Sequence, residues 1–241
     1  MIGRFWPGYW KLFMKLGSIL SPYARRMGQL GLALPVVAPS AMACTYDNQR
    51  TRALMHFEIK GLVRDFVRAA GRVQRSGADG VELHAAHGYL IQQFLSPYTN
   101  RRTDEYGGSL ENRMRFLLEI ISGIRAECGP DFPVMVRLSV DEYYRCIGKP
   151  GMGIELKEGV EMARRLEQAG IDAIDVSSAN YETMNYWLEP ISYEPGWRKN
   201  LAKAVKDAVN IPVLAANLIR SPEQAEAQLA EGTQDFVCLG R

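Results

Sequence analysis

Two histidines and a tyrosine lie directly after a short apolar run in the first half of the chain. The run covers residues 80–83, and His84, His87 and Tyr89 follow it within a few positions. Two imidazole groups could donate hydrogen bonds to an oxygen atom of a substrate, and a nearby phenol could supply a proton. These three residues are therefore our candidate catalytic group.

The same three residues allow other interpretations. An H-x-x-H pair can bind a metal ion, and an isolated histidine is most often structural. A metal site needs a third ligand, and the remaining histidine, His56, lies at what looks like the solvated start of a helix. We therefore predict no metal site, and the residues alone leave a catalytic and a structural role equally open.

Two arginines point to an anionic ligand. Arg137 interrupts the apolar run 133–139, where a charge is costly without an anionic cofactor or an internal carboxylate as partner. Gly240 and Arg241 follow the apolar run 235–239. Loops after the last strands of a parallel barrel often bind phosphate, and an arginine can clamp it in a bidentate manner.

Three further segments have less specific patterns. Residues 94–109 form a long charged loop, in which we expect Arg102, Asp104 and Tyr106 to be structural. Residues 148–153 are rich in glycine but lack the G-x-G-x-x-G spacing, so we interpret them as a flexible loop rather than a dinucleotide site. Five aromatic residues could line an apolar pocket or pack on the surface: Tyr143, Tyr144, Tyr181, Tyr186 and Trp187.

Alternating strands and helices would position the candidate residues. Apolar runs rich in β-branched residues predict strands at 12–16, 80–83, 133–139, 173–177, 211–215 and 235–239. Helical spacing predicts helices at 59–74, 112–128, 155–168 and 201–209, and Ser221 followed by Pro222 begins another. Residues 32–41 are interpreted as a loop because of Pro35 and Pro39.

The repeating strand–helix pattern is typical of a parallel sheet covered by helices. In a TIM (β/α)8 barrel, the C-terminal ends of the strands form the active face, where His84 would lie. The six predicted strands fall two short of the eight that a closed barrel needs. We see no linker or change of composition, and therefore expect a single domain over residues 1–241.

Composition excludes several classes of partner. The chain has 29 basic and 27 acidic residues and a net charge of +2, which gives no reason to expect nucleic acid or an anionic membrane as partner. The apolar runs are too short for a transmembrane helix, and the N-terminal residues lack the features of a signal peptide. The four cysteines form no C-x-x-C pair. We therefore expect a cytoplasmic protein with reduced thiols.

Longer motifs around the candidate residues resemble a known family. The stretch from Val81 to Leu90, the sequence Phe94-Leu95-Ser96-Pro97 and residues 100–109 closely resemble Old Yellow Enzyme. Residues 136–139, Asp175-Val176-Ser177 and Gly240-Arg241 extend the resemblance, which covers nearly the whole chain. Within this family, the chain is most similar to the 2-enoate reductase and 2,4-dienoyl-CoA reductase branch.

The resemblance implies a function. Members are TIM barrels that bind FMN at the C-terminal face of the barrel, take electrons from NAD(P)H and reduce the C=C bond of an enone or enoate. His84 and His87 resemble the pair that binds the carbonyl oxygen of the substrate, and Tyr89 resembles the proton donor. Arg137 resembles the arginine beside flavin N1 and O2, and Gly240 and Arg241 resemble the phosphate site. The substrate would be a small α,β-unsaturated carbonyl compound, and a homo-oligomer is compatible with the resemblance.

Departures from the family pattern shape the remaining expectations. Lys15 stands where the family has a glutamine at the flavin, and Ala216-Asn217 stands near the phosphate where a glycine is usual. The first two barrel strands and the last helix have no counterpart, and no iron–sulfur motif is encoded. The chain would thus be an incomplete barrel. The alternatives are a non-catalytic remnant or one part of a split flavin barrel, and then a flavin-free phosphate-binding lyase that would use Lys15.

Overall fold

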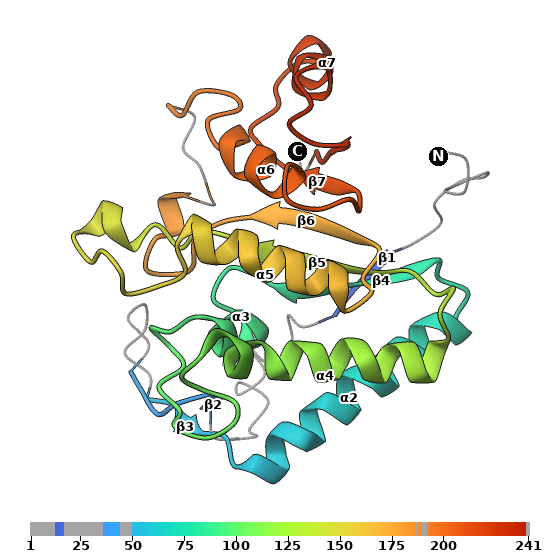
Figure 1. Cartoon of the computed structure of the whole chain (residues 1–241), viewed down its shortest axis with the longest axis vertical. Helices are drawn as coiled ribbons and strands as arrows, with labels where there is room; N and C mark the ends of the chain where they lie inside the picture. The colour runs from blue at the N-terminus through green and yellow to red at the C-terminus, as the bar shows by residue number, and fades with distance from the viewer. Residues whose placement is uncertain (1–12, 17–35, 44–49, 187, 189–191, 240–241) are drawn as a thin grey trace, which may run out of the picture.

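The protein folds around a parallel six-stranded sheet (Figure 1). The computed structural model describes residues 13–16, 36–43, 50–186, 188 and 192–239. The sheet has the order β1-β4-β5-β6-β7-β8, so each strand pairs with the next strand of that sheet along the chain. The strands are β1 (Phe13–Leu16), β4 (Gly80–Ala85), β5 (Val134–Ser139), β6 (Ala173–Ser177), β7 (Val213–Ala215) and β8 (Phe236–Val237).

Helices connect the strands in the manner of consecutive strand–helix units. They are α2 (His56–Arg75), α3 (Leu90–Leu95), α4 (Leu110–Cys128), α5 (Leu156–Gln168), α6 (Lys199–Lys206) and α7 (Pro222–Ala230), with short 3-10 turns at Tyr144–Ile147 and Met184–Tyr186. The Ser221 hydroxyl accepts a hydrogen bond from the Gln224 amide, so Ser221 caps α7 as predicted. Among the helices that the structure describes, none has the length and apolar character needed to cross a membrane.

The two faces of the sheet differ in chemistry because successive side chains of a strand point to opposite sides. One face carries aliphatic side chains such as Val81, Val136 and Ile174, which are fully buried in the core with the helices. On the other face, the register places His84 beside Arg137 and Arg137 beside Asp175. In the next two strands, Leu214 pairs with Asp175 and Phe236 pairs with Leu214, so that these residues form one row across this face.

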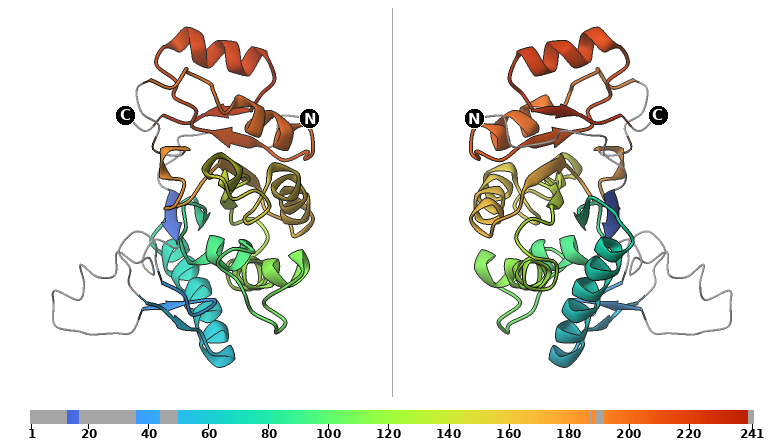
Figure 2. Two further views of the ribbon diagram at one scale, coloured as in Figure 1. Left: turned by 90° about the vertical axis from the view of Figure 1, so that its left-hand side faces the viewer. Right: turned by 90° about the vertical axis from the view of Figure 1, so that its right-hand side faces the viewer.

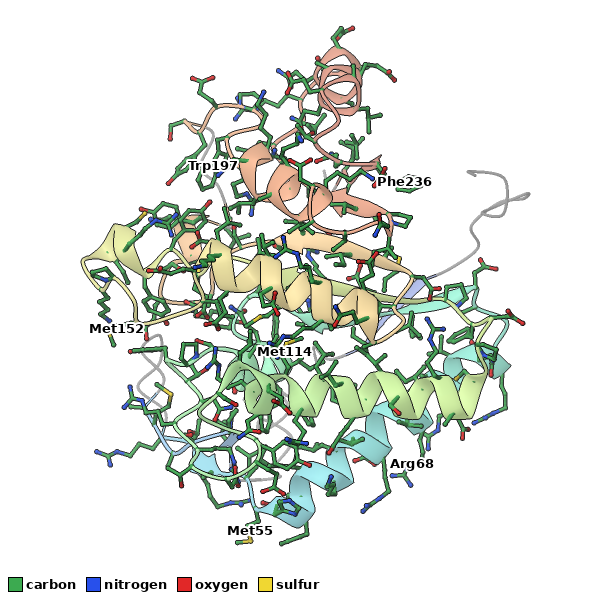
Figure 3. The ribbon with its side chains drawn as sticks, in the orientation of Figure 1. Met55, Arg68, Met114, Met152, Trp197 and Phe236 are labelled. Carbon is green, nitrogen blue, oxygen red and sulfur yellow. The ribbon has the colours of Figure 1, made fainter. Side chains whose placement is uncertain are left out.

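The loops at the C-terminal ends of the strands gather on one side of the molecule. In Figure 1 the segments after β5 and β6 lie at the left, with the two-stranded sheet of β2 (Val37–Ala38) and β3 (Arg52–Ala53) below them. The other views place the helical layer, including α4 and α5, together on one side of the strands (Figure 2). Trp197 lies on the loop side, and Phe236 lies across α6 from it (Figure 3).

The structure confirms most predicted elements and corrects three. Residues 32–41 were expected to be a loop, yet Val37 and Ala38 form β2, which pairs in parallel with β3. Helix α3 was not predicted at all. The strand expected over 235–239 is limited to Phe236 and Val237, because only these two residues pair with β7.

Candidate functional site

The three candidate catalytic residues His84, His87 and Tyr89, called the trio below, lie together at the end of β4. The rings of His84 and His87 lie 5.0 Å apart, and those of His84 and Tyr89 lie 4.7 Å apart, measured between centroids. Both histidines are buried, whereas Tyr89 is partly exposed as the N-cap residue of α3. The structure therefore places two imidazoles and a phenol within the space that one small substrate would occupy.

The backbone conformation of the segment after β4 brings His87 back toward His84. His87 has a φ of 62°, which is unusual for a residue with a Cβ atom, and Gly88 follows with a φ of 79°. The His87 amide donates a hydrogen bond to Ser139 Oγ over 3.3 Å, and His87 Nε2 lies 2.7 Å from Ser177 Oγ. The ends of β5 and β6 thus hold the second histidine in place.

Two glutamines of α3 hold the peptide groups of Gly88. The Gly88 amide donates to Gln92 Oε1 over 2.6 Å, and the Gly88 carbonyl accepts from Gln93 Nε2 over 2.7 Å. Gln92 Nε2 in turn donates to Glu142 Oε1 over 2.9 Å. Because Gln92 and Glu142 are fully buried, these bonds tie the loop that carries the trio to the end of β5.

Glu142 is a buried carboxylate that accepts hydrogen bonds from one helix and two loops. It accepts hydrogen bonds from Gln92, Ser96, the Ile154 amide and Asn180 Nδ2. Burial raises the pKa of Glu142, and the hydrogen bonds from Ser96 and the Ile154 amide act in the opposite direction. The residue therefore joins α3 to the loops after β5 and β6.

Arg137 has an internal carboxylate partner. Its Nε atom lies 3.2 Å from Asp175 Oδ2 of the neighbouring strand, and a quarter of the Arg137 side chain stays exposed. Asp175 is thus the internal carboxylate partner that the sequence analysis gave as one of two alternatives for Arg137. Cys238 lies near the same pair, and burial raises the pKa of its thiol to about 12, with a further contribution from Asp175.

The expected phosphate region is only partly described. Ala216 and Asn217 directly follow β7. The Asn217 side chain is buried; its Oδ1 accepts from the Arg198 amide over 3.0 Å, and Nη2 of Arg198 donates to the Ala216 carbonyl over 3.1 Å. Gly240 and Arg241 lie outside the described residues, as does the Lys15 side chain, although the Lys15 backbone pairs with Glu82. The cofactor contacts expected at these positions stay predictions.

Several expected structural roles are confirmed. The Arg102 guanidinium pairs with Asp104, and it also donates to the Pro39 and Leu54 carbonyls, so it locks the long loop against the β2–β3 segment. Tyr106 is buried against α4. Among the described residues, no group of three or more histidine, cysteine and carboxylate side chains lies close enough together to hold a metal ion.

Sequence reasoning missed the residues that support the trio. These are Gln92, Gln93 and Glu142, and Arg198, which holds Asn217, was missed as well. Ser139 and Ser177 belonged to motifs that we quoted, but they had no assigned role. Glu142 and Asn180 are ordinary polar residues in the sequence, and only a contact between distant loops reveals them. The one available signal was the pair Gln92-Gln93, which interrupts the apolar stretch after Tyr89, because buried amides need partners.

Comparisons with known proteins identify the family. The family model described as "NADH:flavin oxidoreductase / NADH oxidase family" matches residues 28–241. The chain is 45% identical over 233 residues to an NADH oxidase of Thermoanaerobacter brockii, which covers 96% of this chain and 34% of that protein. It is 37% identical over 216 residues to a cinnamate reductase of Clostridium sporogenes, which covers 85% of this chain and 32% of that protein.

Solved structures agree with the sequence comparisons. A 2-naphthoyl-CoA reductase in complex with 2-naphthoyl-CoA matches with a TM-score of 0.76 and 34% identity, covering 85% of this chain and 31% of that one. The Old Yellow Enzyme homologue of Zymomonas mobilis matches with a TM-score of 0.66 and 27% identity, covering 86% of this chain and 57% of that one. The chain thus spans roughly a third to somewhat over half of the length of these relatives, and its fold is that of TIM-barrel members of this group. It belongs to the NADH:flavin oxidoreductase / NADH oxidase family, the Old Yellow Enzyme family of NAD(P)H-dependent flavin oxidoreductases.

Proposed function

We propose that this chain carries the reaction centre of an FMN-dependent ene-reductase, which reduces the activated C=C bond of an enone or enoate. The main support for this proposal is that His84, His87 and Tyr89 lie next to one another at the end of β4. Of the relatives named above, the NADH oxidase supports NADH as the source of electrons, and the cinnamate reductase supports an enoate as the substrate.

The face of the sheet that carries His84, Arg137 and Asp175 fits FMN. Arg137 offers a guanidinium with five N–H donors, and its Nε atom lies 3.2 Å from Asp175 Oδ2. In the same row, Leu214 and the exposed Phe236 supply apolar surface for a planar ring. A cation beside an apolar surface suits an anionic, flat cofactor. Arg137 would hold the flavin ring, and the segments after β7 and β8, with Ala216, Asn217, Gly240 and Arg241, would hold its phosphate.

Each member of the trio has a distinct role in this proposal. Bound FMN would supply the two-electron chemistry, with NAD(P)H as the source of electrons. His84 and His87 donate hydrogen bonds to the carbonyl oxygen of the substrate and stabilise the enolate charge as it develops. Tyr89 transfers its phenolic proton to the α-carbon. The hydrogen bonds to Ser139 and Ser177 keep His87 oriented toward the same oxygen.

The experiment separates the two half-reactions in the protein loaded with FMN. Tyr89→Phe should leave the reduction of the flavin by NAD(P)H unchanged and slow substrate reduction by about 100-fold or more, because the proton donor is lost. Tyr193→Phe removes the same hydroxyl from a ring away from the trio and should leave both rates unchanged. Equal slowing of both half-reactions by Tyr89→Phe would refute the role of Tyr89.

A second candidate is one part of a flavin barrel that binds FMN only together with further strands. It is favoured by Phe236, which is 45% exposed although it lies in a strand of the sheet. Titrating the chain with FMN and following the visible absorption of the flavin distinguishes the two candidates. Saturable binding supports the first, and the absence of binding supports the second.

A further inference from the structure

A pocket lies next to the trio, and Gly88 and Tyr181 form the part of its wall nearest to the trio. Its walls come from the β2–β3 segment, from α3 with the residues that follow it, and from the loops after β5 and β6. Gly88 and Tyr181 line the pocket, and the Tyr181 ring also contacts the Tyr89 ring edge to face, with centroids 6.0 Å apart. The pocket is therefore a neighbour of the proposed reaction centre.

Its walls are largely apolar and aromatic. Ala38 and Met42 form one side, and the rings of Tyr98 and Tyr144, with centroids 4.8 Å apart, form another. Two of the five aromatic residues considered in the sequence, Tyr144 and Tyr181, thus line a pocket. Such walls suit a flat apolar group.

The carboxylates and the threonine hydroxyls in these walls already have partners. Glu142 is saturated by the hydrogen bonds described above, and Glu182 pairs with Lys149 over 3.0 Å. The Thr51 hydroxyl lies within hydrogen-bond distance of the Ser40 and Met42 carbonyls, and the Thr99 hydroxyl donates to the Gln93 carbonyl. These groups therefore make no demand on a ligand.

Gln93 differs from these groups. Its Nε2 atom donates to the Gly88 carbonyl over 2.7 Å, which fixes the orientation of the amide. Its Oε1 atom is buried and accepts no hydrogen bond from any residue that the structure describes. A buried acceptor without a donor is costly, so a group that brings an N–H or O–H would be bound selectively.

We propose that this pocket binds a planar, apolar ring that carries one N–H or O–H donor, with Gln93 Oε1 as the acceptor once the ring displaces the atoms that cover it. The ring could belong to the distal end of a reductase substrate or to a separate small molecule that contacts Gly88 and Tyr181. The two sources share the same chemistry at the pocket. Binding itself does not depend on the reaction proposed above.

Calorimetric titration of the full chain with indole and with indene tests the acceptor. The two probes have nearly the same shape, and only indole has a donor. We expect indole to bind about tenfold more tightly, since one hydrogen bond to a buried acceptor is at stake. In Gln93→Met, both probes should bind equally. Equal binding of indole and indene to the unaltered chain, or binding of neither, would overturn the proposal.

A second pair of variants tests the place of binding without touching Gln93. Ala38→Leu fills the pocket, whereas Ala53→Leu makes the same change at the residue paired with Ala38 in the two-stranded sheet and outside the pocket lining. We expect Ala38→Leu to weaken indole binding at least tenfold and Ala53→Leu to leave it unchanged. Equal effects of the two variants would count against binding in this pocket.

Kinetics of the FMN-loaded protein distinguish the sources of the ring. If the pocket holds the distal ring of a substrate, indole should raise the KM for a ring-bearing enone. The KM for a short acyclic enone should then stay unchanged. If it holds a separate molecule, indole should change kcat for both substrates alike. Because the titration does not require turnover, an inactive protein would refute the proposed reaction and leave the pocket to be judged by binding.

Discussion

His87 Nε2 of the segment after β4 lies 2.7 Å from Ser177 Oγ at the end of β6. The contact spans two strands of the sheet and fixes a ring whose own backbone is in the left-handed region. The orientation of the second histidine therefore depends on a residue that is 90 positions away in the sequence.

Ser177→Ala should reduce the proposed ene-reductase turnover by about tenfold while the fold is retained. The variant loses one hydrogen bond to His87, so the imidazole is less well oriented toward the substrate oxygen. Rates of substrate reduction, measured beside the circular dichroism spectrum, check this. Ser192→Ala, at an exposed position, is the control and should be silent. Unchanged turnover in Ser177→Ala would show that the contact does not position His87.

Gln92→Leu should destabilise the protein by roughly 2–4 kcal/mol. The change leaves the Gly88 amide without its acceptor and removes one of the donors to the buried Glu142 carboxylate. Gln74→Leu, which removes a single half-buried hydrogen bond to the Cys128 carbonyl, should cost about 1 kcal/mol. Denaturant unfolding of both variants gives the comparison, and equal losses would contradict the central role of Gln92.

Two helical glycines should respond to alanine with opposite signs. A Cβ atom at Gly159 in α5 would meet the Val140 carbonyl oxygen at 2.1 Å, so Gly159→Ala should destabilise by about 2 kcal/mol or more. At Gly61 in α2 the nearest atom is the end of the Arg64 side chain at 3.9 Å, so Gly61→Ala should stabilise by about 0.5–1 kcal/mol. Thermal unfolding measures both, and a shift of the same sign in both variants would refute the packing argument.

Glu58 should contribute to stability in a pH-dependent manner. Its side chain accepts from Arg52 and from the Met55 amide, and these bonds lower its pKa from 4.5 to about 2. Because the pKa is lower in the folded state, the contribution is complete above about pH 4.5 and is lost as the pH falls toward 2. Glu58→Gln should therefore lower the melting temperature at neutral pH and converge with the unaltered protein in acid. A difference that stays constant with pH would contradict this assignment.

The sequence allowed the strand–helix alternation to be predicted because each inner strand has one wholly apolar face. Helix α3 escaped prediction because Leu90–Leu95 is six residues long and mostly apolar, so it shows no helical spacing. Strands β2 and β3 are two residues each, too short for any periodic signal.

The trio could be predicted because its members are close in sequence and chemically distinctive. Their supports, Ser139, Ser177 and Glu142, could not, because they act through contacts that exist only once the strand register is set. The same holds for Asp175, which faces Arg137 because β5 and β6 pair in that register. Local sequence thus identifies reactive groups, whereas tertiary pairing identifies what orients them.

The order of the main sheet also bears on how the protein opens. In the described sheet, each strand pairs with the strands that precede and follow it in the order β1-β4-β5-β6-β7-β8. An outer strand can therefore detach while the inner strand pairs stay intact. Strand β8 contributes two residues, while β4, β5 and β6 contribute five or six each. Amide protons of the inner strands should therefore exchange with solvent most slowly, as one cooperative unit, and those of the last strand most rapidly. Since the proposed catalytic trio and its serine anchors lie on and next to the inner strands, the reaction centre would belong to the slowest-exchanging part of the molecule.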